Sequence, residues 1–155
     1  MANHLRRQIR ERVVALCTGL SSTGSNVFEG RAYPVEASKL PCLLVYDGDE
    51  ELEPATLSPA GTRTMVSNLS INIEGYTQSG SGQAVLNSLA QIQKEVQAAL
   101  AGDVTLSSLA GDSFLSSASV EVSSDGNKPT GTNVMTYVVR YGYTENAPDT
   151  ATLRI

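Results

Sequence analysis

The chain has 155 residues, a formal net charge of -5 and two cysteines, and 41% of its residues are hydrophobic. A chain of this length is expected to form a single domain over residues 1–155 that buries roughly 68 to 70% of the unfolded surface, so it needs no disulfide. The negative charge argues against a dedicated nucleic-acid-binding protein, because such proteins carry a basic surplus that neutralises phosphates.

The first predicted element is an amphipathic helix over residues 4–20. Its apolar residues recur at helical spacing, and Arg6, Arg7 and Arg10 lie off the apolar stripe. The frequent charges leave no signal-peptide core, and nowhere does an apolar run reach about 18 residues. We therefore expect no membrane segment and a protein that is cytosolic or released by lysis.

Three strands are predicted next, at residues 26–35, 40–47 and 64–78. The third alternates apolar and polar residues, which is typical of a strand with one buried and one wetter face. Residues 47–62, between the second and third strands, are predicted to form a long polar loop. Its acid cluster consists of Asp47, Asp49, Glu50, Glu51 and Glu53.

A second helix is predicted to open in the segment 79–83 and to stop at Gly102. One helical turn is expected at 105–111, followed by strands at 117–124 and 133–144. The long polar loop at 123–133, which contains Lys128, reads as the hairpin connection between them.

Two features near the C-terminus allow more than one interpretation. The row Tyr137, Val139, Tyr141 and Tyr143 lines either the core or a partner-binding face, and we favour the core. The tail 145–155 is either frayed or docked on a neighbouring subunit through its apolar residues Leu153 and Ile155.

This order of elements predicts an α+β fold. We expect a two-layer sandwich, with a mainly antiparallel or mixed sheet of about five strands and two helices packed on one face. The other face of the sheet would then be open to a partner.

The sequence offers little support for catalysis or cofactor binding. Its only histidine, His4, opens the first helix, where no third group would hold an imidazole in place. The segment "GDSFL" at 111–115 is similar to the nucleophile block of one esterase family, but that block needs a later histidine and none follows it. The segment "DGDEELEPATLS" has leucine and serine where a calcium loop needs glycine and glutamate. A weak divalent-cation site in this acidic loop is the alternative to a solvated loop. We expect no enzyme activity and no cofactor.

The two cysteines are expected to be buried thiols. Cys17 and Cys42 sit in apolar patterns, where free cysteines behave as small hydrophobes. A redox pair or a metal site is the alternative interpretation.

The charges are unevenly distributed, with arginines in the first helix and carboxylates in the loop 47–62. Such poles are either solvated faces or the two halves of a head-to-tail contact between identical subunits.

The segment "HLRRQIRERVVALCTGLSSTGSNVFEGRAYPVEASKLPCLLVYDGDEELE" resembles the opening of tail terminator proteins of long-tailed bacteriophages, the group that includes the lambda-like minor tail protein U. The shared features are an Arg-rich first helix ending in Gly-Leu, a short strand followed by Arg and Pro, and a Leu-Pro-x-Leu-x-Val-Tyr strand leading into an acidic turn. The resemblance extends loosely through the second helix to "YVVRYGY" and is thinnest between 103 and 130.

The resemblance implies a structural virion protein at the head-proximal end of the tail. During assembly this protein would be in the host cytoplasm. Members of the family form a six-membered ring that caps the tail tube and receives the head through connector proteins, while DNA passes through the ring without specific binding. The implied partners are thus other copies of the chain, the tube protein and the connector, without a membrane. A different neck, connector or tail completion subunit is the alternative, followed by a small cytosolic ligand-binding domain.

Overall fold

The computed structural model describes residues 2–30, 37–56, 62–123 and 128–152. In chain order the elements are α1 (Leu5–Cys17), β1 (Val27–Glu29), the short 3-10 helix η1 (Ala37–Lys39), β2 (Cys42–Pro54), β3 (Thr64–Gln78), α2 (Gly82–Ala101), β4 (Asp112–Ser123) and β5 (Thr130–Thr144). The predicted order of helix, three strands, helix and two strands is confirmed.

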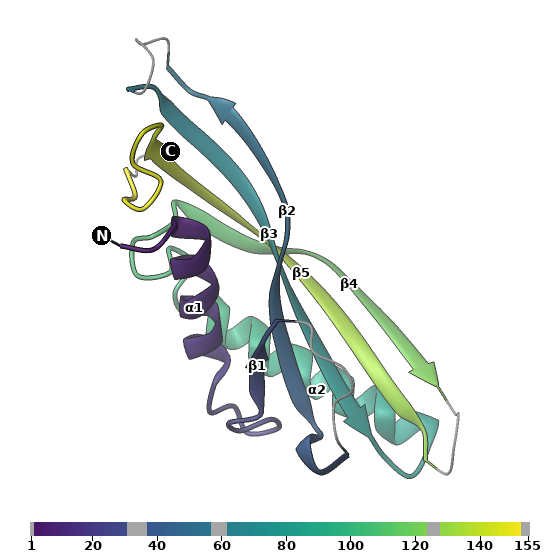
Figure 1. The fold of residues 1–155 in the computed structure, drawn as a ribbon. Coiled ribbons are helices and arrows are strands. Elements are labelled where there is room, and N and C mark those ends of the chain that lie inside the picture. Colours follow the sequence, from purple (N-terminus) through teal and green to yellow (C-terminus); the bar gives the residue numbers. More distant parts are fainter. Residues whose placement is uncertain (1, 31–36, 57–61, 124–127, 153–155) are drawn as a thin grey trace.

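The strands form one mixed sheet in the order β1-β2-β3-β5-β4. β1 runs parallel to β2, and all the other neighbours are antiparallel. Both helices pack on the same face of the sheet, and the outer ends of β2 and β3 extend beyond them (Figure 1). The predicted α+β fold with a five-stranded sheet and two helices is therefore confirmed.

The core lies between the helices and alternate residues of the central strands. The inward-facing residues of β3 and β5 are almost completely buried, and they pack against the apolar stripes of α1 and α2. On β5 these residues are Met135, Tyr137, Val139, Tyr141 and Tyr143. The tyrosine row thus belongs to the core, as expected, and each buried large apolar side chain contributes roughly 1.5–3 kcal/mol to stability.

The two helices begin at capping side chains. The Nδ1 atom of His4 accepts a hydrogen bond from the backbone N–H of Arg6, and the hydroxyl of Ser81 accepts one from Ala84. Such caps satisfy donors that have no partner within the first turn of a helix. His4, the only histidine of the chain, therefore acts as a helix cap.

The structure changes several predicted boundaries. β2 continues through Pro54, so residues 47–54 of the predicted loop 47–62 are strand. β4 begins at Asp112, before the predicted residue 117. β5 begins at Thr130, which shortens the predicted loop 123–133. Residues 57–61 and 124–127 of these loops lie outside the described residues. α1 ends at Cys17, before residue 20, because Thr18 is extended.

The predicted helical turn at 105–111 has the opposite hand. Leu106, Ser107 and Ser108 have φ angles of 51°, 59° and 68°, in the left-handed region. The carboxylate of Asp103 accepts the N–H of Ser107 and also pairs with Arg12 at 2.9 Å. The same carboxylate therefore fixes the left-handed turn and joins it to α1.

Both cysteines are buried and free, as predicted. Burial raises the pKa of the Cys17 thiol to about 12 and that of Cys42 to about 11. Both side chains therefore stay protonated at neutral pH and act as small apolar core residues.

Tyr137 should make stability depend on alkaline pH. Burial raises the pKa of its hydroxyl to about 12, whereas an unfolded tyrosine has a pKa of about 10. The unfolded chain therefore loses this proton first, so the contribution is fully present below about pH 10 and declines as pH rises toward 12. In denaturant unfolding between pH 9 and 12, Tyr137→Phe should lose stability less steeply than the wild type. Parallel profiles would contradict this assignment.

Candidate interaction surfaces

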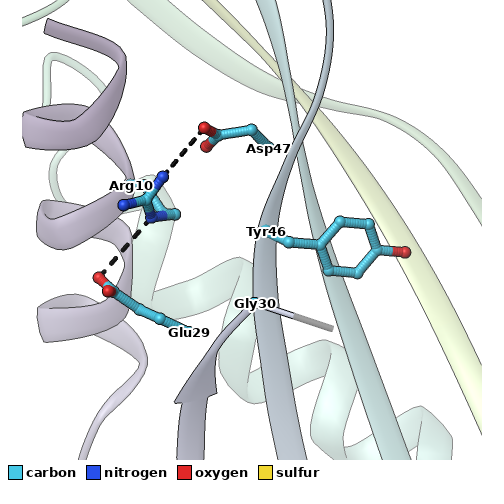
Figure 2. Close-up of a pocket in the computed structure, with 5 residues that line it drawn as sticks. All are labelled: Arg10, Glu29, Gly30, Tyr46 and Asp47. Carbon is cyan, nitrogen blue, oxygen red and sulfur yellow. Dashed lines mark hydrogen bonds and ion pairs between the residues drawn. The ribbon is translucent and has the colours of Figure 1, made fainter. Parts of the chain in front are cut away.

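Two arginines of α1 form ion pairs with carboxylates of the same subunit. The Nη1 atom of Arg10 lies 3.0 Å from Asp47 Oδ2, and its Nε atom lies 3.8 Å from Glu29 Oε1. Arg6 Nε lies 3.4 Å from the same Asp47 oxygen. Figure 2 shows Arg10 between the two carboxylates, while Tyr46 points away from them. These ion pairs connect α1 to β1 and β2.

The position of Asp47 follows from strand register. Asp47 pairs with Ile71, whose side chain belongs to the core, so both point to the face that carries the helices. The adjoining cavity, of about 250 Å³, is lined by Arg10, Glu29, Gly30, Tyr46 and Asp47. The arginine charges are compensated locally, which makes this cluster a structural contact within the subunit.

Arg7 differs from Arg6 and Arg10. Its side chain is 55% exposed, and among the described residues it pairs only with Glu11 of the same helix, at 3.6 Å, besides a long hydrogen bond to Asn3. The structure thus separates the three predicted arginines, because Arg6 and Arg10 both pair with Asp47 of β2, whereas Arg7 pairs within its own helix. A solvent-exposed pair of this kind contributes only about 0.3–0.5 kcal/mol.

The predicted acid cluster is also divided. The hydroxyl of Tyr141 donates a hydrogen bond to Glu50 Oε2. Glu50 and Tyr141 lie on strands separated by β3, where the small, buried Ser67 leaves room for the contact. Burial, followed by the hydrogen bond to Glu50, raises the pKa of Tyr141. Glu50 therefore contributes to the structure of the subunit, as Asp47 does.

The other three acids stay at the surface. Asp49, Glu51 and Glu53 are exposed and form no side-chain hydrogen bond or ion pair with any residue that the structure describes. Glu51 and Glu53 pair in register with Asn68 and Val66, so both point to the sheet face opposite the helices. These carboxylates are the part of the predicted cluster that is open to a partner.

The C-terminal segment packs on the domain as far as it is described. The backbone N–H of Leu5 donates to Pro148 O, and Gln8 Nε2 donates to Asp149 O, both at 2.9 Å. Thr152 N donates to Gly142 O, which joins the segment to β5. The frayed alternative for residues 145–152 is therefore wrong. The predicted docking residues Leu153 and Ile155 lie outside the described residues.

Lys128, the remaining predicted interaction residue, lies just before β5. It is exposed, and it forms no ion pair with the residues that the structure describes. Lys128 is therefore available to a partner.

Sequence reasoning missed the openness of β4. The prediction that Ala118, Val120 and Val122 share a face is correct, because they pair with Met135, Asn133 and Gly131 on the helix side of β5. They are nevertheless exposed, since β4 is the last strand of the sheet. The serines that alternate with these residues were the available signal, because they leave neither face strongly apolar.

The alternative of a weak cation site in the acidic loop finds no support in the described part of β2. Strand alternation sends Glu50 and Glu51 to opposite faces. Across residues 2–30, 37–56, 62–123 and 128–152, no three His, Cys, Asp or Glu side chains gather as metal ligands would. Within the same ranges, no helix is both long and apolar enough to span a bilayer.

Comparisons with known proteins give matches among solved structures alone. No protein-family model matches the sequence, and no curated protein matches it. Among solved structures, the chain is similar to a chain of the virion of a native gene transfer agent particle, with 14% identity and a TM-score of 0.37. The match covers 88% of this chain and 92% of that chain. At this identity and TM-score, the likeness assigns the chain neither an activity nor a partner.

Proposed function

We propose that this chain is a structural virion protein, a tail terminator that forms a ring on the end of a phage tail tube. In this role it stops tube growth and presents a surface to which the head attaches through its connector. Binding between surfaces is sufficient for such a role, which requires neither a catalytic group nor a cofactor.

The observation that carries the proposal is the projecting end of the sheet. The outer parts of β2 and β3 extend beyond both helices (Figure 1), and the side chains on the outer part of β2 are exposed. The side chains of Glu51, Leu52 and Glu53 are all exposed there, and Leu52 keeps 46% of its surface accessible. A rigid strand carrying free charges and an exposed leucine suits docking on another protein.

Electrostatics supports the same role. The formal net charge is -5, and the free carboxylates of β2 add to an acidic surface. Because phosphates are repelled by such a surface, DNA would pass a ring of these subunits without being held.

Reversing the free acids should separate assembly from folding. We expect Glu51→Lys/Glu53→Lys to keep the thermal unfolding midpoint within a few degrees, because both side chains are exposed and unpaired. The same variant should lose tube capping, measured as the length distribution of tail tubes that assemble with the purified protein.

Two further variants serve as controls. Glu51→Gln/Glu53→Gln removes the charges without reversing them and should give an intermediate loss. Glu11→Lys reverses an exposed acid on α1, remote from the projecting strand, and should cap normally. Normal capping by the double lysine variant would contradict the assigned role of the strand.

A further inference from the structure

The sheet has two edges with open hydrogen-bonding positions. β4 has β5 as its only neighbour among the described strands, and β1 covers β2 only at residues 43–45. Residues 50–54 of β2 therefore pair with β3 on one side and have no described strand on the other, although Pro54 at the end of this segment has no N–H to donate. Such edges present backbone N–H and C=O groups that a further strand can use.

Apart from the bulge between Leu115 and Ser117, β4 lacks the features that usually protect an edge strand. Its residues include no lysine, arginine or proline, and only Asp112 and Glu121 carry charge. Phe114, Val120 and Val122 are 52%, 46% and 42% exposed. Proteins normally block a long edge with lysine, proline or inward-pointing charges. An unblocked apolar edge therefore indicates a strand that is covered in the assembled state.

We propose that residues 117–123 of β4 pair with residues 50–54 of β2 in a second copy of this chain, so that the sheet continues from subunit to subunit. This inference rests on the proposed function, in which identical subunits form a ring.

The two segments match in their alternation. On β4, Val120 and Val122 face the helix side, and Ser117 and Ser119 face the open side. On β2, Leu52 faces the helix side and pairs with Ser67, while Glu51 and Glu53 face the open side. Residues that pair across strands share a face, so the pairing joins Leu52 to the apolar side chains of β4 and sets the carboxylates beside a face of serines that also carries Glu121.

Charge favours this pairing over one between two β2 edges. Two copies of β2 would bring the free carboxylates of one strand against those of the other, and like charges directly opposite each other are destabilising. On the corresponding face β4 carries a single carboxylate, Glu121, and otherwise serines, and exposed Lys128 lies just before β5 begins. The acidic strand is thus better accommodated by β4 than by a copy of itself.

The position of the two edges determines the geometry of assembly. β2 and β4 lie on opposite sides of β3 and β5 in the sheet order. Each copy can therefore offer β2 to one neighbour and β4 to another, which is a head-to-tail contact. Contacts of this type close into rings when the rotation between subunits permits it.

The test uses two single-edge variants. Leu52→Lys blocks the β2 edge, and Val120→Lys/Val122→Lys blocks the β4 edge, because lysine at exposed strand positions opposes edge pairing. The matched controls Leu52→Thr and Val120→Thr/Val122→Thr retain uncharged side chains that suit a strand. Mass and association are measured by sedimentation and native mass spectrometry, with unfolding curves to verify the folded state.

We expect the wild type and both threonine controls to self-associate, and each lysine variant alone to bind its own copies about 100-fold more weakly or more. An equimolar mixture of the two lysine variants should form a 1:1 heterodimer, because one intact β2 edge then meets one intact β4 edge. Wild-type assembly by Leu52→Lys would overturn the proposal in favour of β4 pairing with itself. A mixture that stays monomeric, or a wild type that stays monomeric up to about 1 mM, would also overturn it.

A second measurement avoids dependence on the lysine variants. Glu51→Cys in one copy and Ser119→Cys in another place thiols at exposed positions of the two segments, whereas both native cysteines are buried. A short bis-maleimide should link these copies, and it should not link Glu11→Cys to Ser119→Cys. Equal yields from the two mixtures would overturn the proposal.

Failure of the strand pairing can be distinguished from failure of the proposed terminator role. If tails become overlong without this protein while Leu52→Lys assembles normally, the terminator role stands and the strand pairing fails. If tails keep their length without the protein, the terminator role fails, whatever the mixture shows.

Discussion

Arg10→Glu should lower the free energy of unfolding by about 2–4 kcal/mol. The substitution removes the ion pairs of Arg10 with Asp47 and Glu29 and places a third carboxylate between the two. Loss of one partner from a buried pair costs about 3–5 kcal/mol. The expected cost is smaller here because the Arg10 and Asp47 side chains are 23% and 22% exposed to solvent, so water screens part of the repulsion.

Arg7→Glu is the matched control, with the same change of charge on the same helix. Arg7 is 55% exposed and pairs only with Glu11, so stability should change by no more than about 0.5 kcal/mol. Chemical denaturation of both variants measures the difference. Equal losses would contradict the view that Arg10 joins α1 to the strands and Arg7 does not.

Gly131→Ala should cost about 2–3 kcal/mol, because a methyl group at this position has no space. An added Cβ would lie 2.3 Å from Val85 Cγ1 and 2.8 Å from Leu89 Cδ1. Both belong to the core face of α2, so the helix would have to move away from β5. Overfilling a packed core typically costs 1–3 kcal/mol.

The control for this effect is Gly80→Ala, where an added Cβ meets nothing within 4 Å. Its stability should match that of the wild type. Combining Gly131→Ala with Val85→Ala should destabilise less than the sum of the two single changes, because the new methyl group occupies space that valine vacates. Additive losses would show that α2 does not lie this close to β5.

Local patterns predicted most of the fold. The alternation in residues 64–78 gave both bounds of β3, and the apolar stripe of α2 ended at Gly102 as expected. In both elements, burial of one face dominates the choice of structure, so a period of two or of 3.6 residues is visible in the sequence. The alternation of the tyrosine row left both the core and a partner face open, and the structure shows that it lies in the core.

The extension of β2 could not be predicted in this way. Acids and Pro54 are common in loops, and the segment 47–54 has no continuous apolar face. It forms a strand because β3 supplies a partner, and because Glu50 finds the hydroxyl of Tyr141. Both are contacts between residues far apart in the sequence, which local propensity does not report.

The candidate site was predicted only in part. The helical stripe shows that Arg6 and Arg10 share a side of α1, but it does not show that Asp47 lies beneath them. Charge counting therefore assigned to a partner some groups that the fold pairs internally. Glu51 and Glu53, whose strand positions turn them away from the helices, retain the exposed surface that a contact requires.

The most direct test of the terminator role is electron microscopy of lysates from a phage that lacks this gene, with tail length and head attachment measured on the same grids. The account predicts overlong tubes without heads, and normal tails when the wild-type protein is supplied in trans. Tails of normal length without heads would instead indicate a neck or connector subunit. Complete virions of normal length would contradict any role in tail assembly.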